Sequence, residues 1–72
     1  EGRVALLHQN IPNMIGQITS AFAKNGYNIS DLTNKSKGSK AYTLIDIENK
    51  ASESLINELN SIEGILKVRV IK

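Results

Sequence analysis

Short bursts of hydrophobic residues alternate with polar positions along the 72-residue chain. Residues 3–8 contain four consecutive apolar residues, a run too brief for an ordinary helix, which predicts a buried strand. Residues 28–36 are more polar, and their scattered Ile, Leu and Thr suit a strand at the edge of a sheet. Residues 41–48 alternate β-branched with other side chains, as strands do. The last strand, 65–71, should turn alternate apolar residues inward and basic ones outward: Leu66, Val68 and Val70 against Lys67 and Arg69.

Helical spacing replaces this alternation in the segment after the first strand. Apolar residues recur from Ile11 to Phe22 at steps of four, three and four, which places them on one face of a helix. Pro12 fits the first turn, where the missing N–H costs nothing, and Asn10 would then be the N-cap residue. Gly26 is expected to end this helix.

A second helix is predicted after Ser52, because apolar residues between Leu55 and Ile62 again follow helical spacing, and Gly64 should end it. With KGSK, residues 37–40, as a hairpin turn, the order is strand, helix, strand, strand, helix, strand. Right-handed crossovers fold two such halves into an α+β ferredoxin-like βαββαβ sandwich, in which two helices cover one face of a four-stranded antiparallel sheet.

The predicted topology also suggests how two copies would associate. The first and third strands should be central, which leaves the polar second strand at an edge with unpaired backbone groups. The same strand of a second copy can pair there, so we expect a side-by-side dimer with a continuous eight-stranded sheet.

The composition limits the kinds of protein that could have this fold. A domain of this size buries only about 60 % of its unfolded surface, so oligomerisation is expected to add stability. No cysteine and one histidine are present, which excludes disulfides and a structural zinc site. No apolar run approaches the roughly 18 residues that cross a bilayer, and the net charge of +2 comes from scattered basic residues. We therefore expect a cytoplasmic protein that binds neither membrane nor nucleic acid.

The sites that this fold commonly carries are missing from the sequence. A copper-chaperone-like site needs a cysteine pair, and an RNA-recognition surface needs aromatic residues on both central strands, where only Tyr42 is present. An acylphosphatase-like loop would need Arg and Gly where this chain has His, Gln, Asn and Pro. No nucleophile is placed to form a catalytic pair with His8, so we expect a binding domain with no active site, metal or cofactor of its own.

The polar stretch HQNIPN, residues 8–13, joins the first strand to the first helix and holds the only histidine and the only proline. A strand end that leads into a helix N-terminus gathers free backbone N–H groups and the positive end of the helix dipole, which suit a carboxylate. The amides and the imidazole beside it can hold ammonium and hydroxyl groups.

The stretch RVALLHQNIPNMIGQITSAFAKNGYNISDL resembles the opening of an ACT domain, a ligand-binding regulatory module of enzymes in amino-acid metabolism. The pattern His-x-Asn-x-Pro, followed by Asn-Ile in GYNI, is similar to the C-terminal domain of bacterial D-3-phosphoglycerate dehydrogenase. The resemblance implies that residues 1–72 are one regulatory domain, excised from the C-terminus of a longer NAD-dependent enzyme of serine biosynthesis. It also implies that L-serine binds between two side-by-side domains and inhibits that enzyme.

The resemblance carries the serine site onto His8 and Asn10 of one subunit and Asn28 of the facing subunit. Asn10 can accept a hydrogen bond from the ligand ammonium, and His8 can donate to its carboxylate or exchange a hydrogen bond with its hydroxyl. The backbone of the loop and the helix start is expected to complete the site, at Ile11, Pro12 and Asn13.

Asn13 departs from the family pattern, which usually has Gly after the proline. Asn tolerates unusual backbone angles better than most residues, so the loop conformation can be retained. Two alternatives stay open: an ACT domain of another amino-acid enzyme, such as L-serine dehydratase, or a purely structural dimerisation module without a ligand.

Overall fold

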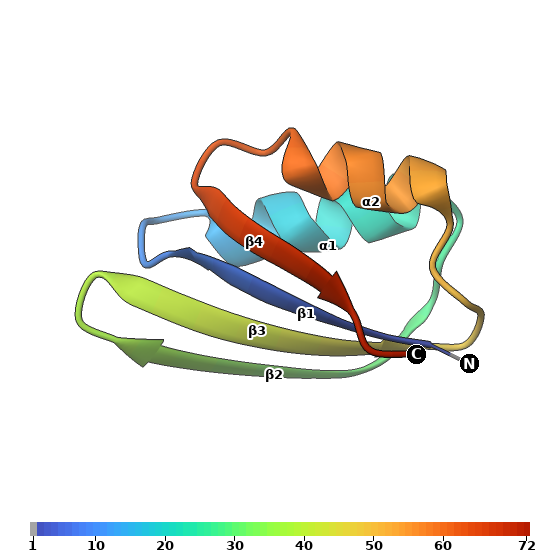
Figure 1. Cartoon of the computed structure of the whole chain (residues 1–72), viewed down its shortest axis with the longest axis horizontal. Coiled ribbons are helices and arrows are strands. Elements are labelled where there is room, and N and C mark those ends of the chain that lie inside the picture. Colours follow the sequence, from blue (N-terminus) through green and yellow to red (C-terminus); the bar gives the residue numbers. More distant parts are fainter. Residues whose placement is uncertain (1) are drawn as a thin grey trace.

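The computed structural model describes residues 2–72; Glu1, the first residue of the predicted 1–72 domain, lies outside the described residues. The elements follow the predicted order (Figure 1). They are β1 (Gly2–Gln9), α1 (Met14–Lys24), β2 (Ile29–Lys37), β3 (Lys40–Ile47), α2 (Glu53–Asn60) and β4 (Ile65–Val70).

The four strands form one antiparallel sheet in the order β2-β3-β1-β4, and both helices cover the same face of it (Figure 1). This is the predicted ferredoxin-like fold, with the first and third strands central and β2 at an edge. The predicted hairpin turn is also present, between β2 and β3, where Gly38 has a φ of 63°.

The core lies between the sheet and the helices. Strand alternation places the inward residues of β1 and β3 opposite each other, because antiparallel partners such as Val4 and Ile45 lie on the same face. The predicted core residues Met14, Ile18 and Phe22 are confirmed. The full buried cluster is Val4, Leu6, Met14, Ile18, Ala21, Phe22, Ile45, Ile47, Leu55 and Leu59.

Helix α1 begins later than the apolar spacing predicted. It starts at Met14, because Asn13 has a left-handed backbone (φ 67°, ψ 13°) that cannot continue a right-handed helix toward its N-terminus. Pro12 therefore lies in the preceding turn, and Ile11 is 45 % exposed and does not belong to the helical stripe. The prediction of Asn10 as N-cap residue was wrong, since Asn13 occupies that position.

The C-terminal end of α1 matches the prediction. Gly26 has a φ of +79°, and two backbone bonds close the last turn: Tyr27 N to Phe22 O at 3.0 Å and Gly26 N to Ala23 O at 3.0 Å. These two bonds are the Schellman arrangement that glycine favours.

Helix α2 is shorter than predicted. Ser52 is its N-cap residue, as expected, and the Ser52 hydroxyl accepts a hydrogen bond from Leu55 N at 3.1 Å. The helix ends at Asn60 rather than at Gly64. Ile62 still packs against the core, but it does so from the turn after the helix.

The inward pattern predicted for β4 was wrong at Leu66, which is 47 % exposed. The pairing with β1 shifts at this point, because Leu7 faces Lys67 while His8 faces Ile65, and Leu66 is left out of the ladder. Ile65 and Val68 pack on the core instead. Val70 pairs with buried Val4 but stays 51 % exposed on this edge strand.

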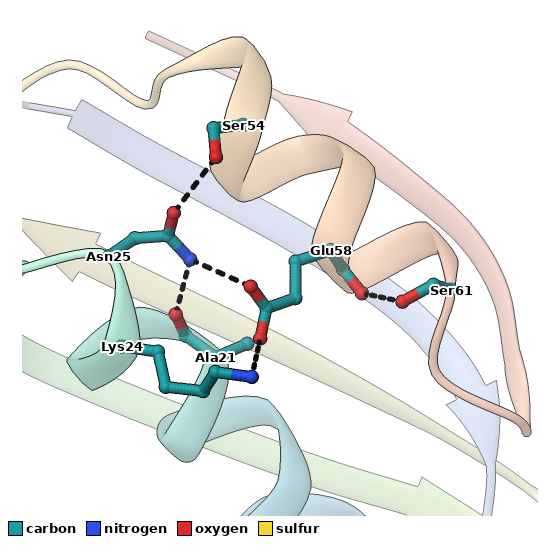
Figure 2. Close-up of polar contacts among 6 residues, drawn as sticks. All are labelled: Ala21, Lys24, Asn25, Ser54, Glu58 and Ser61. Carbon is teal, nitrogen blue, oxygen red and sulfur yellow. Dashed lines mark hydrogen bonds and ion pairs between the residues drawn. The ribbon is translucent and has the colours of Figure 1, made fainter.

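A polar cluster joins the two helices (Figure 2). Lys24 Nζ lies 3.1 Å from Glu58 Oε2, and the Asn25 amide donates to Glu58 Oε1 at 3.2 Å. The Ser54 hydroxyl donates to Asn25 Oδ1 at 3.1 Å. The hydrogen bonds from Lys24 and then Asn25 hold the pKa of Glu58 below its ordinary value.

The two ends of the described chain meet at one end of the sheet (Figure 1). Arg3 N donates to Lys72 O at 2.7 Å, and Ile71 N donates to Arg3 O at 2.8 Å. The Arg3 side chain also pairs with Asp46, at 2.6 Å, and this hydrogen bond lowers the pKa of the Asp46 carboxyl. Neither helix of residues 2–72 has the length and apolarity needed to cross a membrane.

Candidate functional site

His8 lies near the end of β1 and points toward the helix-covered side of the sheet, where only 2 % of it is exposed. Both nitrogens of its ring are engaged. Nδ1 lies 3.0 Å from the carbonyl oxygen of Gln9, and Nε2 lies 2.7 Å from the hydroxyl of Thr43. The imidazole is therefore held in one orientation by two neighbours.

Two residues that the sequence did not single out continue this contact across the sheet. The hydroxyl of Thr43, on β3, is fully buried and lies 2.9 Å from Asn34 Oδ1. Asn34 is the register partner of Thr43 on the edge strand β2, and it is exposed. We call His8, Thr43 and Asn34 the polar row, because they follow one another across β1, β3 and β2 on the helix side, with His8 diagonal to Thr43.

Asn10 ties the loop after β1 to the β2–β3 hairpin. Its backbone N donates to Ser39 O at 2.8 Å, and its side-chain amide donates to Gly38 O at 3.2 Å. The Asn10 side-chain oxygen has no hydrogen bond within residues 2–72 and can accept one from a ligand. A groove of about 450 Å³ borders this loop, lined by Gln9, Asn10, Ile11, Ser39, Lys40 and Leu66.

Asn13 keeps the left-handed conformation for which a glycine is usual, and it is the one non-glycine residue with positive φ among residues 2–72. The loop conformation expected for this position is thus retained. The side chain of Asn13 makes no capping hydrogen bond and lies against Gly16, where a Cβ atom would be 2.6 Å from Asn13 Oδ1. Because α1 begins at Met14, directly after this residue, the positive end of the helix dipole lies at the loop.

Asn28 lies at the opposite end of the same sheet. The next residue, Ile29, pairs with Ile47, whereas His8 pairs with Ala41, six residues away along β3. At about 3.3 Å per residue, this separates Asn28 from the loop by roughly 20 Å within one chain. A second copy paired antiparallel through β2 would reverse this direction and bring its own Asn28 toward the loop end.

The donor set is suited to a small organic ligand rather than to a metal ion. Within residues 2–72 there is no group of three His, Cys, Asp or Glu side chains that could hold a metal. The polar row and the loop instead offer amide, hydroxyl and imidazole groups beside a helix N-terminus. Such groups can bind a zwitterion through its carboxylate and its ammonium.

A family model described as "AHAS small subunit-like ACT domain" matches residues 4–67. The chain belongs to this ACT-domain family. ACT domains are regulatory modules that generally bind amino acids, and an ACT domain has no active site of its own. No curated protein sequence matches the chain.

Solved structures of ACT domains share the fold. The ACT domain of GTP pyrophosphokinase from Chlorobium tepidum superposes with a TM-score of 0.81 at 19 % identity, over 97 % of this chain and 95 % of that one. The acetolactate synthase small subunit from Thermotoga maritima superposes with a TM-score of 0.72 at 20 % identity, over 96 % of this chain and 45 % of that one. The regulatory subunit of aspartate kinase from Thermus thermophilus superposes with a TM-score of 0.70 at 11 % identity, over 99 % of this chain and 50 % of that one.

The last two proteins are about twice as long as the ACT domain described here. At these identities the superpositions establish the fold alone. None of the three is a D-3-phosphoglycerate dehydrogenase, so the expected host enzyme and its ligand L-serine remain proposals.

Proposed function

We propose that this ACT domain is an amino-acid sensor that binds L-serine between two copies and thereby regulates a host enzyme. The observation that carries the proposal is the polar loop at the junction of β1 and α1, which holds the His-x-Asn-x-Pro pattern at a helix start. The ligand would bias the relative arrangement of two subunits by binding one arrangement more tightly.

Each part of the ligand has a matching group in this proposal. The carboxylate would lie at the start of α1, near the backbone of Ile11, Pro12 and Asn13, where the helix dipole favours negative charge. The side-chain oxygen of Asn10 would accept from the ammonium, and Asn28 of a second copy would close the site from the other side. A direct contact from His8 would require the imidazole to leave Thr43 or Gln9.

The edge strand β2 supports pairing with a second copy. It is nine residues long, has a neighbour on one side only within residues 2–72, and is mostly exposed. An edge of this length offers unpaired N–H and C=O groups that a second β2 can satisfy. We propose a two-fold pairing that extends the sheet to eight strands and places one ligand site at each end of the β2 pair.

Two hosts are compatible with such a sensor. The loop pattern favours a D-3-phosphoglycerate dehydrogenase, in which serine acts as the feedback inhibitor of its own synthesis and the enzyme uses NAD. The family match over residues 4–67 favours an AHAS-like enzyme, for which the ligand need not be serine. A panel of amino acids distinguishes these hosts by the ligand that binds.

The proposal is tested by calorimetric titration of the chain with L-serine, glycine, L-alanine, L-valine and L-lysine, together with thermal unfolding. A ligand at 100 times its Kd stabilises the folded state by about 2.7 kcal/mol, which is a measurable shift in Tm. Asn10→Ala and Asn28→Ala should abolish the heat of serine binding. Asn60→Ala is the matched control, because Asn60 is exposed on α2 and, within residues 2–72, its side chain bonds only to Ile56 O.

Sedimentation velocity with and without L-serine measures the pairing. We expect a dimer whose dissociation is suppressed by the ligand. A wild-type chain that gives neither heat nor a Tm shift with any amino acid at millimolar concentration would refute the sensor and leave a dimerisation module.

A further inference from the structure

The edge strand β2 carries charges of both signs on one face of the sheet. Asp31 and Lys35 are the register partners of Asp46 and Tyr42 on β3, and directly opposite residues lie on the same face. Tyr42 is exposed, whereas the next residue, Thr43, is buried on the helix side. Asp31 and Lys35 therefore both lie on the face that carries no helix, which we call the open face (Figure 1).

Neither of these two charges is neutralised within one copy. Asp31 and Lys35 are both exposed, and neither forms an ion pair within residues 2–72. Asp31 lies opposite another carboxylate, that of Asp46, and Lys35 is two residues from Lys37 on the same face. Like charges directly opposite each other on a sheet are destabilising. An acidic and a basic group of β2 thus both lack a partner of opposite charge.

We propose that two copies pair through β2 in the register that places Thr33 opposite Thr33 of the second copy. This inference rests on the pairing in the proposed function, and it specifies which residues meet. In this register Asp31 of each copy lies directly opposite Lys35 of the other on the open face, which forms two opposite-charge pairs in the dimer. All nine residues of the strand are paired, because Thr33 is the middle residue of Ile29–Lys37.

The neighbouring registers are less favourable. An axis at Leu32 would place Asp31 opposite a threonine. An axis at Asn34 would place Asp31 opposite Lys37, but the first residues of β2 would then extend past the hairpin of the second copy. An axis at Asp31 or Lys35 would place two like charges against each other. Thr33 is the axis that both forms the charge pairs and keeps the whole strand paired.

The other edge strand, β4, does not offer such a match. It has six residues, and its two charged residues, Lys67 and Arg69, are both basic. A second β4 paired about Val68 would place Lys67 opposite Arg69, and an axis at either residue would place that residue opposite itself. The distribution of charge therefore favours β2 as the self-pairing edge.

This register also brings Asn28 of the second copy to the loop of the first. Strand β2 has one extra residue, Ser30, relative to β3. With the same residue left out of the pairing between copies, Asn28 of the second copy lies opposite Lys37, which directly precedes Gly38. The Asn10 side chain donates to Gly38 O at 3.2 Å. The second copy thus supplies an asparagine beside the hairpin that Asn10 contacts.

Sedimentation equilibrium at low salt, about 50 mM, tests the charge pairs through the Kd of the dimer. Lys35→Asp brings two carboxylates together in each pair, so the Kd should rise about tenfold or more. Lys37→Asp is the matched control, because it makes the same change of charge on the same face and has no charged residue opposite it in this register. Asp31→Lys should weaken the dimer as Lys35→Asp does. An equimolar mixture of these two variants should form a heterodimer, since both of its pairs again have opposite charges.

A cysteine variant locates the axis independently of charge, because the chain has no cysteine of its own. Directly opposite residues of antiparallel strands have Cα atoms about 4.5–5.5 Å apart, which is within the range of a disulfide. Thr33→Cys should therefore form a covalent dimer in a glutathione buffer. Lys37→Cys should not, because its two copies would lie roughly 26 Å apart.

The outcomes separate this inference from the proposed function. If Lys35→Asp dimerises like the wild type and Lys37→Asp does not, the axis lies at Asn34, and the register is wrong although the pairing through β2 stands. If no charge variant weakens the dimer and Thr33→Cys forms no covalent dimer, β2 is not the interface, and the proposed pairing fails together with this inference. A wild-type chain that stays monomeric at millimolar concentration with and without L-serine would overturn both as well. The binding of amino acids is measured separately, by calorimetry.

Discussion

Gly16→Ala should affect stability differently depending on the residue at position 13. Gly16 lies in the first turn of α1, and an added Cβ would be 2.6 Å from Asn13 Oδ1 and 3.7 Å from Asn13 Cγ. No other atom of residues 2–72 would lie within 4 Å of it apart from its own helix backbone and chain neighbours. The left-handed Asn13 and the glycine three residues later are thus a matched pair, in which the small residue makes room for the carboxamide.

The expected magnitude combines two opposing contributions. Replacing a helical glycine with alanine stabilises by about 1 kcal/mol, because alanine loses less backbone entropy on folding. Displacing the Asn13 side chain from its rotamer costs about 0.5–1.5 kcal/mol, so Gly16→Ala alone should leave stability nearly unchanged. In an Asn13→Gly background that cost disappears, and the same substitution should stabilise by about 1 kcal/mol.

Urea unfolding of four proteins measures this coupling: wild type, Asn13→Gly, Gly16→Ala and the double variant, all at one protein concentration. An unchanged m value would show that the substitutions leave the compactness of the denatured state and the two-state transition unaltered. The double-mutant cycle should give a coupling of about 1 kcal/mol in favour of the double variant. Effects that add to within about 0.3 kcal/mol would refute the reasoning, since independent sites behave in that way.

Two further predictions concern contacts away from the loop. The pKa values of Asp46 and Glu58 are lowered in the folded chain, mainly by hydrogen bonds from Arg3 and Lys24 respectively. Both carboxylates therefore add stability at a pH above the ordinary carboxyl pKa of about 4. This contribution is lost as the pH falls through the lowered pKa values. Urea midpoints measured from pH 6 to pH 2 should fall less steeply in Lys24→Gln than in wild type, and identical slopes would contradict this assignment. Tyr27→Phe should destabilise by about 1 kcal/mol, because the Tyr27 hydroxyl donates to Lys50 O at 2.8 Å and accepts from Ser52 N at 2.7 Å. Tyr42→Phe is the control, since the Tyr42 hydroxyl has no hydrogen-bond partner within residues 2–72. Equal losses of stability in the two variants would show that the two hydrogen bonds of the Tyr27 hydroxyl do not stabilise the fold.

Strand alternation and glycine positions were sufficient to predict most of the fold. Thr43, Ile45 and Ile47 face inward as their spacing indicates, and Gly26 ends α1 with positive φ. The alternation failed where the backbone departs from regular geometry. A left-handed residue cannot be seen in the spacing of apolar residues, so the helix was expected to begin before Met14.

The same limitation applies to Leu66. A bulge arises from the pairing of two strands that are distant in sequence, and it leaves no periodic signal in the strand that contains it. The polar row was missed for a related reason. Local patterns identify His8 as a polar strand end, but its link to Asn34 passes through Thr43 and depends on the register of three strands. A hydroxyl at an inward position of β3 was the available signal.

The meeting of the two chain ends has a consequence for how this domain can be joined to other proteins. The backbone bonds between Arg3 and Lys72 place both attachment points side by side, at the end of the sheet away from the loop of residues 8–13. A domain built in this way can be appended to either side of another domain, or inserted into one of its surface loops, without stretching the chain. A circular permutant that joins Lys72 to Gly2 through a short linker and opens the hairpin at Gly38 should keep the same sheet. A host attached at these two points would hold the domain at one end of the sheet, with the loop of residues 8–13 at the other end.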